Sequence, residues 1–314
     1  MRPEPDDPPS RLREGLGVGT RPGSDAASDR SAPPPDPLSQ AGGGVRAALA
    51  KAAEALGPVS DTPRLDAELL MAHALGVARD ELLLGHLDAS APAGFFTFVE
   101  RRLQGQPVAY ITGVRDFWTI ALAVGPGVLI PRPDSETLIE AAVAHFRGTP
   151  GPRRVLDLGT GSGALLLAAL AEWPKARGIG IDRSPQALAI ARANAERLGM
   201  ADRADMIKGD WAGTDARFDL ILCNPPYIAE DEPLPREVAA YEPACALFAG
   251  PDGLDAYRAI APLLRNQLAP GGIACLEIGA TQAAAVSRLL RAEGFAPGVH
   301  RDLAGRERCV TVTP

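Results

Sequence analysis

The sequence predicts an α/β protein with an open, mostly parallel sheet, preceded by a small all-helical domain. From Arg153 onward, strand-like and helix-like patterns alternate at the spacing of βαβ units, which place parallel strands in one sheet. Residues 45–103 instead show helical periodicity. With 314 residues and 46% hydrophobic content, the chain is long enough to bury two modest cores. We therefore expect four parts: a disordered tail over 1–43, a helical domain over 44–105, a β-hairpin linker over 106–131 and the α/β domain over 132–314.

Charge and hydropathy argue against several classes of protein. The formal net charge is −7, from 32 basic and 39 acidic residues, and this balance disfavours an extended nucleic-acid-binding surface. No stretch is apolar for long enough to span a bilayer, so we expect no membrane association. A monomer is the expected state.

The cysteines and histidines indicate neither disulfides nor a metal. The cysteines have no CxxC spacing and lie within or beside apolar runs, which favours reduced thiols and a cytoplasmic location. There are four of them: Cys223, Cys245, Cys275 and Cys309. The histidines are scattered without metal-ligand spacing, which predicts no metal site. They are His73, His86, His145 and His300.

The first 43 residues differ in composition from the rest of the chain. They are rich in Pro, Gly, Ser, Asp and Arg and contain almost no large apolar residue. Such a segment buries too little surface to offset the entropy of ordering, which predicts disorder. Its acidic residues and its lack of an apolar segment argue against a signal or transit peptide.

The helical domain is predicted from apolar spacing and from helix start and stop signals. Asp61 is a candidate cap for its second helix, which places Leu65, Leu69 and Ala72 on one face before Gly76 ends it. These apolar stripes indicate a core and contain no catalytic group. The expected helices cover residues 45–56, 61–76, 81–84 and 92–103.

The linker is predicted from short β-rich pieces that Gly and Pro separate. These pieces are residues 108–112, 117–124 and 128–130. Asp134 and Ser135 then offer caps to a helix over 136–146.

The α/β domain is predicted to contain five parallel strands and a final antiparallel strand at the edge of the sheet. The parallel strands are expected at residues 155–157, 178–182, 204–208, 218–223 and 273–278, and the edge strand at 309–312. Helices are expected at residues 164–173, 184–198, 255–268 and 281–291.

A glycine loop joins the first strand of this domain to its helix. Its three glycines allow a ligand to approach the backbone closely, and by spacing alone the loop also matches a dinucleotide fingerprint. Asp157 stands just before the loop, where a pyrophosphate would be repelled. A carboxylate there suits the cationic amino group or the sulfonium neighbourhood of S-adenosylmethionine. The predicted cofactor-binding residues here are Asp157, Gly159, Thr160, Gly161, Ser162 and Gly163.

Three further side chains follow the next two strands. Asp182 ends the second strand, where its carboxylate can accept hydrogen bonds from both ribose hydroxyls of a nucleoside. Trp211 is predicted to lie against the adenine, and Asp210 to meet its exocyclic amino group. Packing in the core is the competing interpretation for Trp211.

The fourth strand is followed directly by the residues Asn224, Pro225, Pro226 and Tyr227. Two prolines end a sheet ladder abruptly because proline has no N–H and its φ is fixed. An Asn held in this way presents one acceptor and two donors in a plane, which suits another planar N–H group. The competing interpretation is a strand end with Asn as a turn residue. The glycine loop and Asp182 favour a ligand site, because the carboxyl ends of parallel strands share one edge of the sheet.

These residues together resemble the class I S-adenosylmethionine-dependent methyltransferases with an Asn-Pro-Pro-Tyr signature. Within that Rossmann-like group, the chain is similar to the release factor glutamine methyltransferases (PrmC/HemK family). The resemblance extends over about residues 45–313, and the first 43 residues of the chain lie outside it. It rests on residues 106–113 (QPVAYITG), 129–136 (LIPRPDSE), 157–163 (DLGTGSG), 224–227 (NPPY), 241–243 (YEP) and 302–306 (DLAGR).

The resemblance implies methylation of the side-chain amide nitrogen N5 of glutamine in the Gly-Gly-Gln motif of class I peptide chain release factors. The helical domain would then help to dock that protein. Asn224 and the Pro225 carbonyl would accept the two amide N–H groups, Pro226 would keep the turn rigid, and Tyr227 would wall the amide plane. Residues 280–281 (AT) depart from the longer side chains that the family often carries there.

Other functions stay open at this point. A glutamine in a ribosomal protein is one alternative substrate, although residues 132–136 (RPDSE) favour the release-factor branch. A flipped adenine or cytosine presents a similar planar amino group. A cofactor-binding but non-catalytic interaction module and a dinucleotide oxidoreductase are less well supported, the latter because no hydride-transfer acid or base is evident.

Overall fold

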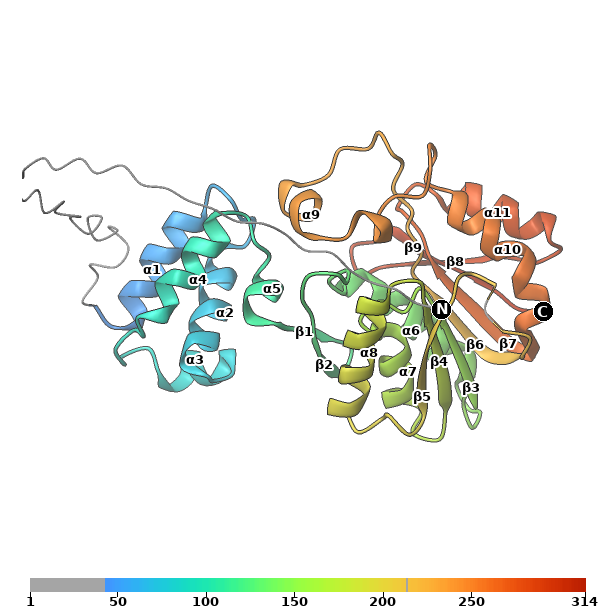
Figure 1. Cartoon of the computed structure of the whole chain (residues 1–314), viewed down its shortest axis with the longest axis horizontal. Helices are drawn as coiled ribbons and strands as arrows, with labels where there is room; N and C mark the ends of the chain where they lie inside the picture. Colours follow the sequence, from blue (N-terminus) through green and yellow to red (C-terminus); the bar gives the residue numbers. More distant parts are fainter. Residues whose placement is uncertain (1–42, 213) are drawn as a thin grey trace, which may run out of the picture.

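A computed structural model describes residues 43–212 and 214–314. Helices α1 to α4 form one part of the molecule, and α5 and the β1–β2 hairpin join it to a larger part built around a seven-stranded sheet (Figure 1). The disorder predicted for residues 1–43 lies outside the described residues except at position 43. Among the described residues, no helix is both long and apolar enough to cross a membrane.

The helical part has its own core. Its helices are α1 (Val45–Leu56), α2 (Pro63–Leu75), α3 (Arg79–Gly85) and α4 (Gly94–Leu103). Gly76 ends α2 in the left-handed conformation, as predicted, with φ of +70°. The predicted apolar face of α2 was partly wrong: Ala72 is buried as expected, but Leu65 is 38% exposed, and Leu70 and Met71 are buried instead. The predicted cap, Asp61, was also wrong, because the N-cap of α2 is Thr62. The hydroxyl groups of Ser60 and Thr62 donate to Asp66 in the first turn.

The predicted linker is only partly β. Residues 108–112 form helix α5 (Val108–Thr112) and not a strand, and 128–130 form no strand. The β-branched residues of α5 suggested a strand, but Ile111 packs into the helical core while Tyr110 packs into a core of the sheet part. Burial on both sides overrides the weak local propensity. The hairpin pairs β1 (Val114–Phe117) with β2 (Ile120–Ala123).

The sheet has the order β5-β4-β3-β6-β7-β9-β8. Strands β3 to β7 pair with one another in parallel, which confirms the predicted mostly parallel sheet. They are β3 (Arg154–Leu158), β4 (Arg177–Asp182), β5 (Ala204–Lys208), β6 (Phe218–Cys223) and β7 (Leu268–Glu277). The chain order reverses between β3 and β6, and in such sheets this switch point marks the ligand crevice at the carboxyl ends.

The carboxyl-terminal strands differ from the prediction. Strand β9 (Glu307–Val312) lies between β7 and β8, so it is not the edge strand that we expected. The edge is β8 (Gly298–Arg301), whose short and mostly exposed sequence gives no strand signal. Helix α9 (Arg236–Tyr241) was not predicted either, because none of its residues is buried to give a periodic pattern.

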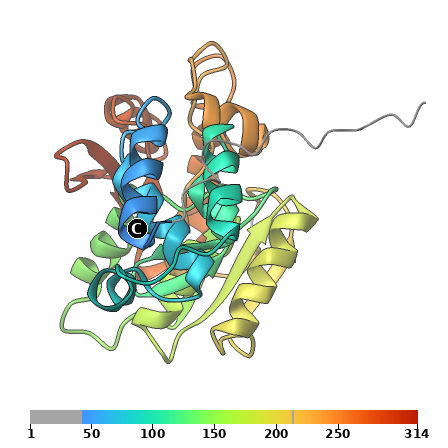
Figure 2. The same ribbon diagram turned by 90° about the vertical axis from the view of Figure 1, so that its left-hand side faces the viewer.

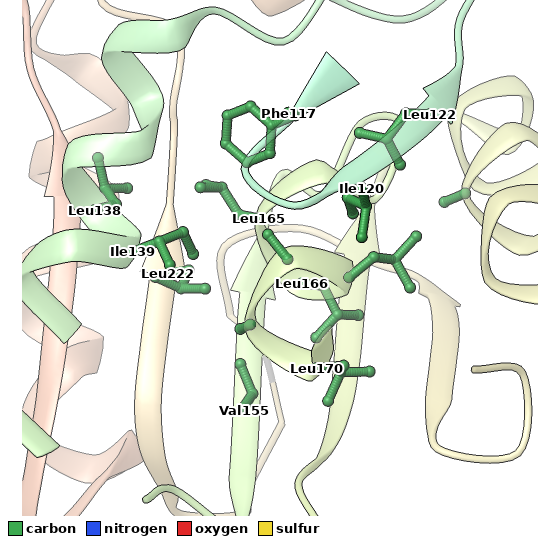
Figure 3. Close-up of a cluster of buried hydrophobic side chains, with 14 of the residues drawn as sticks. Phe117, Ile120, Leu122, Leu138, Ile139, Val155, Leu165, Leu166, Leu170 and Leu222 are labelled. Carbon is green, nitrogen blue, oxygen red and sulfur yellow. The ribbon is translucent and has the colours of Figure 1, made fainter. Parts of the chain in front are cut away.

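Side chains alternate between the two faces of the sheet and fill two separate cores. Helices α6 (Glu136–Phe146), α7 (Ala164–Glu172) and α8 (Pro185–Arg197) supply side chains to one core (Figure 3). Helices α10 (Asp255–Gln267) and α11 (Ala283–Ala292) supply the other. Along β3, Val155 belongs to the first core, and Leu156 and Leu158 belong to the second. Because side chains of β3 enter both cores, this strand is buried on both faces of the sheet.

Helix α9 links the helical part to the sheet part. Viewed from the helical side, the helical part lies in front of the sheet (Figure 2). Arg102 at the end of α4 is buried, and its guanidinium donates to Asp66 of α2 at 2.8 Å and to Glu237 of α9 at 2.8 Å. The hydroxyl of Tyr241 donates to the Gln104 carbonyl at 3.3 Å. The segment after Tyr227 is therefore connected to the helical part by polar contacts.

Candidate active site

One pocket lies at the carboxyl edge of the sheet. It collects residues that follow β3, β4, β5 and β6, as the sequence predicted for a parallel sheet. The predicted site residues that line it are Asp157, Gly159, Thr160, Gly161, Ser162, Asp182, Asp210, Trp211, Asn224 and Pro226. Three predicted residues do not line it: Gly163, Pro225 and Tyr227.

The glycine loop turns sharply because its glycines adopt positive φ. Gly159, Gly161 and Gly163 have φ of +74°, +56° and +85°, a region that other L-residues rarely occupy. The loop is tied to β4, since the amides of Gly159 and Thr160 both donate to the Ile181 carbonyl. Gly163 serves as the N-cap of α7 and so has a structural position behind the pocket.

Asp157 has the most unusual environment in the pocket. Its side chain is buried, and Oδ2 accepts hydrogen bonds from the Thr160 hydroxyl at 2.6 Å and from the Leu166 amide at 3.2 Å. Oδ1 has no partner among the described residues. Burial raises the pKa of Asp157 to about 7, with a smaller contribution from the Asp182 charge, although the two hydrogen bonds oppose the change. A buried oxygen without a donor is costly and fits a site for a cationic ligand group.

Asp182 organises the loop as well as facing the pocket. Its Oδ2 accepts the Gly161 amide at 2.9 Å and its Oδ1 accepts the Ser184 amide at 2.8 Å. Each carboxylate oxygen has a second lone pair, so a ribose hydroxyl can still donate to it. Ser184 caps α8, as predicted, by accepting the Ala187 amide.

Trp211 lies over the glycine loop. A Cβ built on Gly159 would stand 3.3 Å from the Trp211 ring, so only a glycine fits there without displacement of the ring. The ring also packs against the second core, which is the arrangement expected from the competing packing interpretation. Asp210 is exposed, and its Oδ1 accepts the Ala212 amide at 2.9 Å.

Asn224 directly follows β6, and its carboxamide is held by one contact. Its Nδ2 donates to the Ser135 hydroxyl at 3.2 Å. Its Oδ1 accepts no hydrogen bond from the part of the chain that the structure describes. The carboxamide therefore keeps an acceptor available at the pocket, which both Asn224 and Ser135 line.

Tyr227 does not line the pocket, and its hydroxyl contacts a buried carboxylate. Its hydroxyl donates to Glu277 Oε1 at 3.4 Å, and its carbonyl accepts from Gln282 at 2.8 Å. Burial, together with the Glu277 charge, raises the pKa of Tyr227 well above its usual value. Both ends of this residue are thus fixed, by the last residue of β7 and by the segment that follows it.

A second group of residues braces the pocket wall formed by positions 127–131. The hydroxyl of Tyr110 donates to the Val128 carbonyl at 2.5 Å, and Glu242 Oε2 accepts the Ile130 amide at 3.1 Å. Glu242 also forms an ion pair with Arg132. Burial raises the pKa of Tyr110 to about 12, so it stays a neutral donor. These contacts bring the segments QPVAYITG, LIPRPDSE and YEP together at one wall of the pocket.

Sequence reasoning missed several residues of the site. Pro243, Cys245 and Ala246 line the pocket from the segment after α9, and Ser135 and Glu277 contact the Asn-Pro-Pro-Tyr motif. The blocks LIPRPDSE and YEP, which carry the family resemblance, were the available signal, but such a block does not say which of its side chains face a pocket. Within residues 43–212 and 214–314, no group of three or more His, Cys, Asp or Glu could hold a metal.

Comparison with known proteins identifies both parts of the chain. The family model "PrmC N-terminal domain" matches residues 47–113, and "Methyltransferase domain" matches residues 152–293. A release factor glutamine methyltransferase of Rhodospirillum rubrum is 45% identical over 257 residues, covering 80% of this chain and 78% of that protein. One of Cereibacter sphaeroides is 46% identical over 258 residues, covering 80% and 91% respectively.

A solved structure shares the fold. The catalytic domain of hMettl16, in complex with a MAT2A 3'UTR hairpin, aligns with a TM-score of 0.51 at 16% identity. The alignment covers 66% of this chain and 80% of that one. At this identity the likeness concerns the fold alone, whereas the sequence relatives match across both parts of the chain. The chain belongs to the release factor glutamine methyltransferase family.

Proposed function

We propose that the protein transfers a methyl group from S-adenosylmethionine to the side-chain amide nitrogen N5 of the glutamine in the Gly-Gly-Gln motif of class I peptide chain release factors, in the cytoplasm. The observation that carries this proposal is the Asn224 carboxamide at the pocket, with Nδ2 bound to Ser135 and Oδ1 available. A planar amide is complementary to that acceptor. The family of the chain supports the choice of substrate.

The pocket residues fit the cofactor. Asp157 Oδ1, buried and without a partner among the described residues, suits the amino group of its methionine part. Asp182 suits the ribose hydroxyls, and Trp211 and Asp210 suit the adenine and its amino group. Thr160, Gly161 and Ser162 bring the backbone close to the ligand. When bound, S-adenosylmethionine supplies an electrophilic methyl group on a sulfonium.

The chain's own contribution to the transfer is to position and stabilise the amide. The nitrogen of a primary amide is a poor nucleophile because its lone pair is delocalised into the carbonyl. As the new N–C bond forms, the S–CH₃ bond breaks and leaves S-adenosylhomocysteine, while the nitrogen gains positive charge and then releases one proton to solvent. Asn224 Oδ1 and the Pro225 carbonyl accept its two N–H groups, which orients the nitrogen and stabilises that charge.

Positioning is a large enough effect to account for much of the rate. Fixing two reactants in a reactive arrangement lowers a barrier by about 7–11 kcal/mol. Pro225 and Pro226 restrict the backbone at this turn, and Tyr227 is fixed at both its hydroxyl and its carbonyl. No strong general base is required by this mechanism.

The helical part is proposed to dock the release factor. It belongs to the region that matches the family's N-terminal domain, and it contacts the α9 segment through Arg102 and Glu237. A large protein substrate needs contacts beyond one glutamine, and an adjacent domain with its own core provides a rigid surface for them.

The proposal is tested with labelled S-adenosylmethionine and a purified release factor. One arm uses the normal Gly-Gly-Gln motif and the other uses its Gln→Ala version. Label on the first alone supports the glutamine assignment, and equal label on both contradicts it. Label on a ribosomal protein or on RNA, with none on the release factor, would support the alternative substrates instead.

A further inference from the structure

The Asn-Pro-Pro-Tyr turn has two positions without a backbone donor. Pro225 and Pro226 have no N–H group, so neither can donate a backbone hydrogen bond that would hold the turn in place. On one side the turn continues from β6, whose last residue, Cys223, is paired in the sheet with both neighbouring strands. On the other side the chain leaves the sheet at Tyr227. The position of the turn therefore depends on what holds Tyr227.

The backbone carbonyl of Tyr227 is held by Gln282, a side chain that the mechanism above does not use. Nε2 of Gln282 donates to this carbonyl at 2.8 Å and to the Gly253 carbonyl at 3.3 Å. Its Oε1 accepts the Gly279 amide at 3.0 Å. One side chain thus joins three segments at the carboxyl edge of the sheet: the turn after β6, the loop before α10 and the turn after β7.

The partners of Gln282 define the orientation of its side-chain amide. A backbone amide only donates and a carbonyl only accepts, so Oε1 must face Gly279 and the NH₂ group must face the two carbonyls. The backbone amide of Gln282 also donates to the Gly279 carbonyl at 2.9 Å, which closes a reciprocal pair within the turn. Ala280 and Thr281, where the sequence departs from the family resemblance, are exposed. The contacts are made by the two ends of this turn, and that departure leaves them in place.

Gly253 lies against the same carbonyl from another side. It has φ of +70°, a conformation that favours glycine. A Cβ built on it would overlap the carbonyl oxygen of Tyr227 and stand 2.9 Å from Nε2 of Gln282. Any other residue at this position would therefore have to displace the Tyr227 carbonyl.

The chain beyond Tyr227 is paired with the segment that lines the pocket. The Ile228 amide donates to the Leu247 carbonyl at 3.0 Å, and the Ala249 amide donates to the Ile228 carbonyl at 2.9 Å. Ala246, directly before this pairing, lines the pocket. The Tyr227 carbonyl is thus held where the Asn-Pro-Pro-Tyr turn meets the pocket wall.

We propose that Gln282 and Gly253 are positioning residues: by holding the Tyr227 carbonyl, they set the place of the two acceptors for the substrate amide. These acceptors are Asn224 Oδ1 and the Pro225 carbonyl. The fixed φ of the two prolines leaves the turn few ways to relax, so a displacement at Tyr227 is carried back along it. Neither Gln282 nor Gly253 lines the pocket. The proposal rests on the function proposed above and adds two residues to that site.

The first test removes the donor of Gln282 at nearly constant size. Gln282→Met deletes both hydrogen bonds to the carbonyls, and Gln282→Glu at pH 8.5 places a carboxylate, which only accepts, against them. Each should lower kcat on a purified release factor by about 10-fold per cofactor-binding site counted by calorimetry. KM for the release factor and Kd for S-adenosylmethionine should stay within about twofold of the wild type. Wild-type kcat in Gln282→Met would overturn the proposal.

The second test moves the same carbonyl through Gly253→Ala, which should also lower kcat by about 10-fold. Gly148→Ala is the matched control, since Gly148 has φ of +78° but open space at its Cβ position among the described residues. The two changes share the conformational cost, and only one meets the Tyr227 carbonyl. Gly148→Ala should lower the melting temperature and keep the wild-type kcat. Equal kcat in the two glycine variants contradicts the proposal.

The double variant asks whether both residues act through one carbonyl. Gln282→Met combined with Gly253→Ala should lose less kcat than the product of the two single losses, because the second change acts on a carbonyl that is already displaced. Losses that multiply in full would show that the two residues act independently.

A further readout does not depend on activity. In protein labelled with carbonyl-¹³C tyrosine and ¹⁵N isoleucine, only Ile111 and Ile228 follow a tyrosine and give a carbonyl–amide signal. The Tyr227 signal, assigned by its loss in Ile228→Val, should shift in Gln282→Met and in Gly253→Ala but not in the glycine control. An unchanged signal in Gln282→Met contradicts the positioning role even if methylation falls. If the wild type methylates no release factor while the signal shifts as expected, the proposed substrate fails and the role of Gln282 in fixing this turn stands.

Discussion

Asp157 and Glu277 are two buried carboxylates that stand on opposite sides of the strand that carries Asn224. Asp157 belongs to β3 and Glu277 to β7, the two neighbours of β6. Each is 1% exposed, each has one oxygen without a partner among the described residues, and burial raises the pKa of each to about 7. Only Asp157 lines the pocket.

The difference between them separates two tasks at one site. The free oxygen of Asp157 is available to a ligand, so its charge is expected to act on cofactor affinity. The charge of Glu277 acts on a protein group, the hydroxyl of Tyr227 in the Asn-Pro-Pro-Tyr motif, and is expected to act on the amide. Changes at Asp157 should therefore alter Kd, and changes at Glu277 and Asn224 should alter kcat.

The largest effect on the amide side is expected from Asn224→Ala. Loss of one preorganised hydrogen-bonding group at a reacting centre costs about 10²–10³ in kcat. Steady-state kinetics on a release factor should show this loss, while calorimetry shows a cofactor Kd within about twofold of the wild type. Full turnover by Asn224→Ala would exclude the mechanism proposed here.

On the cofactor side, Asp157→Asn should weaken binding of S-adenosylmethionine by about 10-fold to 100-fold, since a hydrogen bond to a charged group is worth about 1.5–3 kcal/mol. The ligand-free variant should melt no lower than the wild type, because the replacement removes a buried charge. Calorimetry and thermal melting measure the two effects. A variant with wild-type affinity would show that Oδ1 of Asp157 does not meet the cofactor.

The raised pKa of Asp157 predicts a pH dependence of binding. A cationic ligand group needs the ionised carboxylate, so below pH 7 the affinity should fall by up to about tenfold per pH unit. The ligand-free protein should behave in the opposite sense. Its folded state holds the Asp157 proton more tightly than the unfolded state does, so this contribution to stability is present at low pH and is lost as the pH rises through about 7.

Calorimetry between pH 5.5 and 8.5 separates the two carboxylates. Affinity should become independent of pH over this range in Asp157→Asn and should keep its pH dependence in Glu277→Met. The reverse pattern, with pH-independent affinity in Glu277→Met and retained pH dependence in Asp157→Asn, would show that Glu277 and not Asp157 meets the cofactor.

The smallest effect is expected from the contact between the two parts of the chain. Arg102 is buried but keeps its bond to Asp66, and the Glu237 side chain is 42% exposed, so loss of this one pair is expected to cost about 0.2–1 kcal/mol, the range measured for exposed pairs. Glu237→Gln should therefore raise KM for an intact release factor by only about 1.4-fold to fivefold. It should leave KM for a short Gly-Gly-Gln peptide unchanged. Glu307→Gln, which breaks the exposed pair with Arg301, is the control.

The comparison of the two carboxylates also shows what the sequence can predict. Asp157 was found because it stands beside a glycine loop at the end of an apolar strand, and local order along the chain is enough for that. Glu277 was given no role by the sequence analysis. Its contact with Tyr227 joins residues 50 apart, and the contact between Asn224 and Ser135 joins residues 89 apart. Such contacts depend on which strands become neighbours.

The same limit applies to the fold. The parallel strands were predictable because strands buried on both faces form apolar runs between glycines and prolines. Helix α5 was not, because Tyr110 and Ile111 gain their burial from two different cores that only exist after folding. Strand β8 is held by its pairing with β9 and has little apolar pattern of its own.

The most direct test of the central claim is to locate the methyl group on a release factor by mass spectrometry after incubation with the wild type and with Asn224→Ala. The account predicts one methyl group on the glutamine of the Gly-Gly-Gln motif with the wild type, and none above background with the variant at equal cofactor occupancy. A methyl group on another residue, or an equal yield from Asn224→Ala, would contradict it.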